Sequence, residues 1–109
     1  MVVRQIVNRA TFHSAKMEKS DLVAMGKLFV GLNAFEPGHE HRTHIHNGQD
    51  KLYLVLEGEG DVTVENETAR ISSGDLVTIQ SGEEHALVNS GLGRLVVMVV
   101  MAPPPNSKI

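Results

Sequence analysis

Hydrophobic positions along the chain come in short runs separated by glycine, asparagine and proline, and few follow the helical period of about 3.6 residues. Turn residues recur at short, even intervals, which is typical of a β-sandwich or barrel. The pattern therefore predicts an all-β protein, with residues 15–24 as the one short helical segment. The expected strands are residues 2–7, 27–35, 43–45, 51–57, 61–65, 69–72, 76–80, 86–89 and 94–101.

Two of the expected strands are apolar on both faces. In residues 51–57, alternation places three leucines on one face and Tyr53 and Val55 on the other. Residues 94–101 are apolar on both faces as well, so each face should be covered, one by the barrel interior and the other by a second sheet or subunit. We expect a homodimer with an isologous interface. The alternative is that the N-terminal strand covers the outer face within one chain.

Size and charge narrow the class of protein. The 109 residues suit one domain, which we expect to span residues 1–102 and to be followed by a proline-rich tail, residues 103–109. A net charge of −3 without a cluster of Lys and Arg argues against a nucleic-acid partner. The longest apolar run is too short to cross a membrane, and no apolar signal segment follows Met1. We expect a cytoplasmic protein without a membrane partner.

Histidine is the main candidate for chemistry. The chain has no cysteine, which excludes disulfides and thiolate ligands, but it has six histidines. His44 and His46 are two residues apart in an extended segment, so they project to one side and can converge on one ion. The plain alternative is that they are solvated loop residues. We interpret His39 and His41, just before them, as loop residues near a pocket rim.

Two stretches of the chain place glycines, histidines and other polar residues at fixed spacings. The first contains Gly38, His44, His46, Lys51 and Gly58, and the second contains Gly74, Gln80, Gly82, His85 and Asn89. These spacings resemble the two motifs of the cupin family. The resemblance implies a small double-sheet β-barrel of the jelly-roll type, with ligands pointing inward at one mouth. It also implies that His85 joins His44 and His46 on one divalent transition metal, which would be zinc, nickel, manganese, iron or copper.

Lys51 departs from the family pattern, because cupins usually place a ligating glutamate there. An ammonium group repels a divalent cation, so Lys51 would have to be neutral, paired or turned aside, or else it binds an anionic ligand. Gln49 or Asp50 could supply a fourth oxygen if the strand begins with a bulge. The simplest expected site is the three histidines, with Lys51 and Tyr53 lining the substrate pocket. A lysine nitrogen already at the point where the imidazoles meet would contradict the metal hypothesis.

Three functions stay open for this site. The first is a metal-dependent dioxygenase or isomerase that acts on a small polar molecule. The second is a binding module that captures a small molecule without turnover. The third is a metal-free isomerase or epimerase in which His44 or His85 is the base and Lys51 replaces the ion. No catalytic residue is assigned, and Asn89, Gln80 and the glycines are expected to shape turns.

Overall fold

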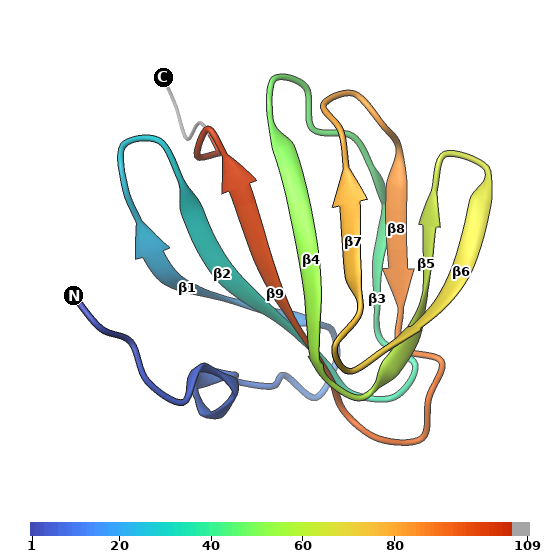
Figure 1. The fold of residues 1–109 in the computed structure, drawn as a ribbon. Helices are drawn as coiled ribbons and strands as arrows, with labels where there is room; N and C mark the ends of the chain where they lie inside the picture. Colours follow the sequence, from blue (N-terminus) through green and yellow to red (C-terminus); the bar gives the residue numbers. More distant parts are fainter. Residues whose placement is uncertain (106–109) are drawn as a thin grey trace.

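The strands of the structure, a computed structural model that describes residues 1–105, pack as two antiparallel sheets (Figure 1). The strands are β1 (Glu18–Ala24), β2 (Phe29–Phe35), β3 (Glu40–His44), β4 (Asp50–Glu57), β5 (Glu59–Val64), β6 (Glu67–Ser72), β7 (Leu76–Ile79), β8 (His85–Val88) and β9 (Leu95–Ala102). The five-stranded sheet has the order β1-β2-β9-β4-β7, and the four-stranded sheet has the order β3-β8-β5-β6. The predicted all-β, double-sheet fold is confirmed.

The N-terminal region corrects the sequence prediction. A short helical segment is present, but it is the 3-10 helix η1 (Ile6–Arg9), so the strand predicted over residues 2–7 is wrong. The helix predicted over residues 15–24 is also wrong, because Glu18–Ala24 forms β1 and pairs with β2. Pairing with the free edge of β2 overrides the weak local preference of this segment. Residues 106–109 of the predicted tail lie outside the described residues, and the domain boundary at Ala102 stays a prediction.

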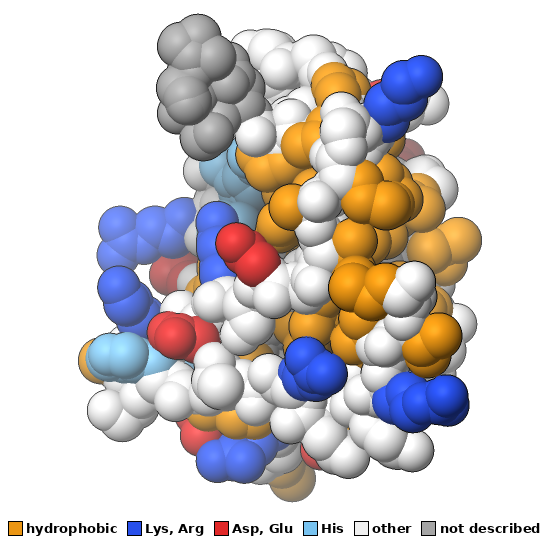
Figure 2. All heavy atoms as spheres, turned by 90° about the vertical axis from the view of Figure 1, so that its left-hand side faces the viewer, with side chains coloured by type: hydrophobic (Ala, Val, Ile, Leu, Met, Phe, Trp, Pro, Cys, Tyr) orange, Lys and Arg blue, Asp and Glu red, His pale blue; other side chains and the backbone are white. Residues whose placement is uncertain are grey.

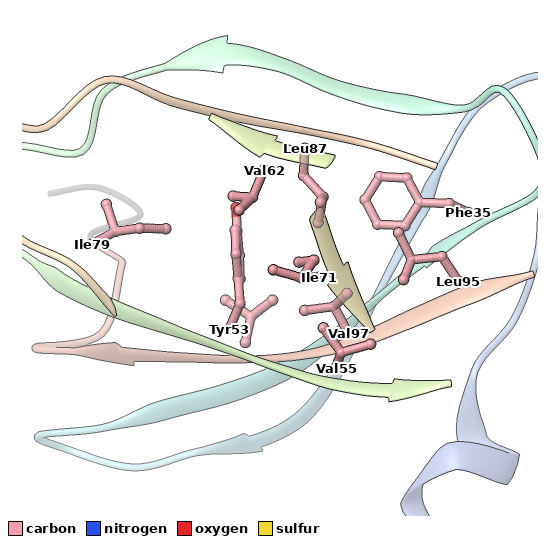
Figure 3. Close-up of a cluster of buried hydrophobic side chains, with 10 residues drawn as sticks. Phe35, Tyr53, Val55, Val62, Ile71, Ile79, Leu87, Leu95 and Val97 are labelled. Atoms are coloured by element: carbon pink, nitrogen blue, oxygen red, sulfur yellow. The ribbon is translucent and has the colours of Figure 1, made fainter. Parts of the chain in front are cut away.

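The core lies between the two sheets (Figure 3). Alternation along β4 points Lys51, Tyr53 and Val55 inward, and each is at most 3% exposed. Residues paired across neighbouring strands lie on the same face of a sheet. Met101 of β9 and Ile79 of β7 are paired with Lys51, so they lie on this inner face as well. The buried apolar cluster consists of Phe35, Tyr53, Val55, Val62, Ile71, Ile79, Leu87, Leu95, Val97 and Val99.

Backbone hydrogen bonds to Asn89 close one end of the barrel. Its side-chain Nδ2 donates to the carbonyl oxygens of Phe35 and Gly93, at 3.0 and 2.9 Å, and its Oδ1 accepts from the Gly91 N–H at 3.0 Å. The predicted role of Asn89 in holding a turn is confirmed. Gly58 also belongs to this end: its φ is +85°, and a Cβ there would collide with the Arg94 carbonyl oxygen.

The outer face of the five-stranded sheet is apolar and partly covered. Leu32, Ala34 and Val96 are buried on this face, whereas Leu52 and Leu76 are 37% and 60% exposed. Figure 2 shows apolar side chains gathered along one side of the molecule. Part of this face therefore remains open to a partner.

No helix within residues 1–105 has the length and apolar character that crossing a membrane requires. The cytoplasmic location stays a prediction from the sequence.

Candidate functional site

Three histidines meet at the open end of the barrel. His44 ends β3, His46 follows two residues later, and His85 begins β8. Because β3 pairs with β8, His44 lies directly opposite His85. One ring nitrogen from each histidine lies within 4.8 Å of the others. The structure therefore brings together the three imidazoles that the sequence analysis grouped.

Backbone carbonyls orient two of these rings. His44 Nδ1 lies 2.7 Å from the Arg42 carbonyl oxygen, and His85 Nδ1 lies 3.0 Å from that of Glu83. A carbonyl oxygen only accepts, so each Nδ1 carries the proton and each Nε2 presents a lone pair to the site. Metal-binding imidazoles are held in this way, and the rings alone would suit a transition metal.

Lys51 occupies the space into which these lone pairs point. Its Nζ lies 3.2 Å from His44 Nε2 and 2.9 Å from His85 Nε2, and the residue is 3% exposed. The ammonium group donates to both rings, so an ion bound to the same two nitrogens would have to displace it. Within residues 1–105 no carboxylate forms an ion pair with Lys51. The three histidines are therefore positioned to hold a divalent metal only if the Lys51 side chain moves out of this position.

The histidines are neutral at physiological pH, and Lys51 carries the charge. Burial, with smaller contributions from nearby positive groups, lowers the pKa of His41 to about 3 and the pKa values of His46 and His85 to about 4. Burial also lowers the pKa of Lys51, to about 8, and the charge of Lys19 contributes. At pH 7 the site is therefore an ammonium group among uncharged imidazoles.

A cavity of about 430 Å³, which we call the barrel cavity, opens beside this cluster. Lys51, His46 and His41 line it on the histidine side, and β1 and β2 contribute Lys19 and Asn33. Figure 2 looks from the β1 side and shows a histidine recessed beside basic and acidic side chains. Much of the remaining wall is apolar. A cavity of this size, with few polar groups on an apolar wall, is typical of a small-molecule site.

Other predicted site residues have different places. Tyr53 does not line the barrel cavity: its ring belongs to the core, and its buried hydroxyl has no hydrogen-bond partner in residues 1–105. Burial raises its pKa. Asp50 Oδ1 accepts from the Ser81 N–H at 3.0 Å, on the loop before β8. His41 stacks on His44, with ring centroids 3.9 Å apart, while His39 Nδ1 accepts from the Glu36 N–H.

Sequence reasoning missed Lys19 and Asn33 as cavity residues. Both lie on the inner face because Lys19 of β1 is paired with Asn33 of β2. The sequence analysis expected a helix over residues 15–24, and a helix there gives Lys19 no defined neighbour. It therefore did not place Lys19 at the cavity. Alternation along Phe29–Phe35 contained the information that Asn33 shares a face with Phe35.

Comparison with known proteins supports this architecture. Residues 31–101 match the cupin domain family. A curated oxalate-binding protein from Thermotoga maritima is 32% identical over 85 residues, which cover 78% of this chain and 69% of that protein. A 5-nitrosalicylic acid 1,2-dioxygenase from Bradyrhizobium is 36% identical over 59 residues, covering 54% of this chain and only 28% of that enzyme.

A solved structure agrees over almost the whole chain. The TT1209 protein from Thermus thermophilus superposes with a TM-score of 0.91 at 30% identity, and the match covers 96% of this chain and all of that one. Family, topology and the inward-facing histidines thus coincide, and the chain belongs to the cupin family.

Proposed function

We propose that the chain binds a small organic anion in the barrel cavity and that Lys51 is the group that binds its charge. The observation that carries the proposal is the position of Lys51 Nζ, held between His44 Nε2 and His85 Nε2 without a carboxylate partner in residues 1–105. A buried charge without a counterion is costly, and a bound anion offsets that cost. The neutral imidazoles orient the ammonium group and add no competing charge.

The relatives agree with a small-molecule site but differ in what their names describe. One is named for binding oxalate, which is an anion, and another for dioxygenase activity. Only the anion-binding role is favoured by the geometry of Lys51 in this chain. We therefore place binding before turnover, and treat dioxygenase or isomerase activity as the finer catalytic hypotheses.

The proposal is tested by titrating the purified, untagged protein with oxalate and acetate in a calorimeter. Lys51→Met keeps most of the length of the side chain and removes the charge, and we expect it to raise the Kd at least about 30-fold. Lys27→Met, on an exposed residue that does not line the cavity, is the matched control and should leave the Kd unchanged. An unchanged Kd in Lys51→Met would overturn the proposal.

A metal-dependent function is the second candidate, and the convergence of the three ring nitrogens favours it. In this case one divalent transition metal (zinc, nickel, manganese, iron or copper) binds to His44, His46 and His85 after Lys51 turns aside. Elemental analysis of the untagged protein discriminates the two. About one equivalent of metal in the wild type would replace the metal-free proposal. Its absence, together with metal uptake by Lys51→Glu, would support the metal-free proposal.

We also propose that the chain is a homodimer that buries the open part of the apolar sheet face. Leu52 and Leu76 lie there on adjacent strands, and both are exposed. We expect Leu52→Lys together with Leu76→Lys to halve the mass measured by light scattering. Leu92→Lys is the matched control, since Leu92 is fully exposed on a loop outside the strands. A monomeric wild type would contradict the proposal.

A further inference from the structure

We propose that the anion is a carboxylate with an apolar body, and that Lys19 is a second group that recognises it. The inference rests on the proposed function, because it specifies the ligand that Lys51 binds. It goes further in assigning a specificity role to β1, the edge strand of the five-stranded sheet.

Two amines face one cavity. Lys19 reaches the barrel cavity from β1 and Lys51 reaches it from β4, on the other side of β2 and β9. Neither forms an ion pair within residues 1–105, although Asp21 lines the same cavity. Two ammonium groups that share a partly enclosed space repel each other, and a carboxylate between them removes this repulsion.

A buried amide adds a hydrogen-bonding group. Asn33 is 6% exposed, lines the barrel cavity and lies opposite Lys19 in the β1–β2 register. Its side chain forms no hydrogen bond within residues 1–105, and its amide atoms are not among the fully buried polar atoms left unpaired there, so they face the open space of the cavity. Asn33 Nδ2 is therefore available to donate to a carboxylate oxygen.

The rest of the wall requires an apolar body on the ligand. Phe29, Val99 and Met101 line the barrel cavity between the two amines. Gly31 allows the Phe29 ring to lie close against β2, because a Cβ there would approach that ring to 3.0 Å and the Ser20 carbonyl oxygen to 2.8 Å. A ligand as small as oxalate would leave this apolar wall exposed to water, whereas an alkyl or aryl group would cover it.

The experiment compares carboxylates that differ only in their apolar part. Acetate, butyrate and benzoate are titrated into the wild type, with benzamide as the uncharged control. We expect butyrate to bind about tenfold more tightly than acetate because of its two additional methylene groups. Benzoate should bind at least as tightly as butyrate, and benzamide should show no saturable binding.

Matched lysine variants test the role of β1. Lys19→Gln should raise the benzoate Kd about fivefold, as expected for removal of one partly exposed charge contact. Lys27→Gln changes a lysine in the β1–β2 turn that does not line the cavity, and should leave the Kd unchanged. Circular dichroism and the melting temperature show whether both variants fold.

The outcomes separate this inference from the proposed function. Equal affinities for acetate, butyrate and benzoate would overturn the apolar body, and a wild-type Kd in Lys19→Gln would overturn the second recognition group. In both cases the proposed anion site at Lys51 is still supported if Lys51→Met weakens carboxylate binding. If no carboxylate binds the wild type, the proposed function fails and the inference fails with it.

Discussion

Buried polar side chains have different hydrogen-bond partners at the two ends of the barrel interior. At the closed end, Asn89 is 1% exposed and makes three hydrogen bonds to the backbone. At the open end, Lys51 is nearly as buried, but within residues 1–105 its ammonium group hydrogen-bonds to two imidazoles and otherwise lies over the Tyr53 ring, 5.4 Å from its centroid. The Asn33 side chain forms no hydrogen bond within residues 1–105. Strand β4 connects the two environments. Asn89 at the closed end supports the fold, whereas we propose that the polar groups at the open end bind a ligand, so stability and binding should be separable.

The largest effect on stability is expected at the closed end. Asn89→Ala removes the side-chain partner of one buried and two partly buried backbone groups, so the free energy of unfolding should fall by about 3 kcal/mol. Urea titration measures this loss, and the benzoate Kd of the folded protein should not change. Ser90→Ala, which removes one exposed hydrogen bond to Arg70, is the control. A loss of binding without loss of stability would contradict the comparison.

Lys51→Met should have the opposite pattern. It should weaken carboxylate binding, but it also removes a buried charge that has no counterion within residues 1–105. The free energy of unfolding should therefore stay constant or rise by about 1 kcal/mol. Urea titration in ligand-free buffer measures it. Marked destabilisation would mean that Lys51 mainly supports the fold.

Acid should destabilise the protein through the open end. The folded-state pKa values of His41, His46 and His85, at about 3 to 4, are below the value of about 6.5 in the unfolded chain. The unfolded state therefore binds more protons in this interval. The contribution of these histidines to stability is complete above about pH 6.5 and is lost as the pH approaches 4. His41→Asn should reduce the slope measured by urea titration, and stability that rises on acidification would contradict the prediction.

The smallest effect is expected where the N-terminal segment meets the closed end. The Arg94 guanidinium lies over the Phe12 ring, 4.1 Å from its centroid. Phe12→Leu keeps most of the apolar contact and removes the cation–π interaction, so the free energy of unfolding should fall by about 0.5 kcal/mol. Urea titration measures this loss. An altered benzoate Kd would show that the closed end affects binding at the open end, and would contradict the comparison.

Local sequence predicted most of the fold. Alternating apolar residues and turn glycines indicated the strands from Phe29 onward, because both signals act over a few neighbouring residues. The prediction was wrong at β1, because the conformation of this segment depends on pairing with the edge of β2. The motif spacing correctly grouped His44, His46 and His85, but it did not include Lys19 or Asn33.

The sequence by itself determined the fold class, the histidines that converge and the presence of a lysine among them. Only the tertiary structure decided that Lys51 Nζ lies between two imidazoles and that β1 contributes Lys19 to the cavity. The physical reason is the range of each effect. Alternation and turns are local, whereas the position of a long side chain depends on strands that are distant in sequence and adjacent in space.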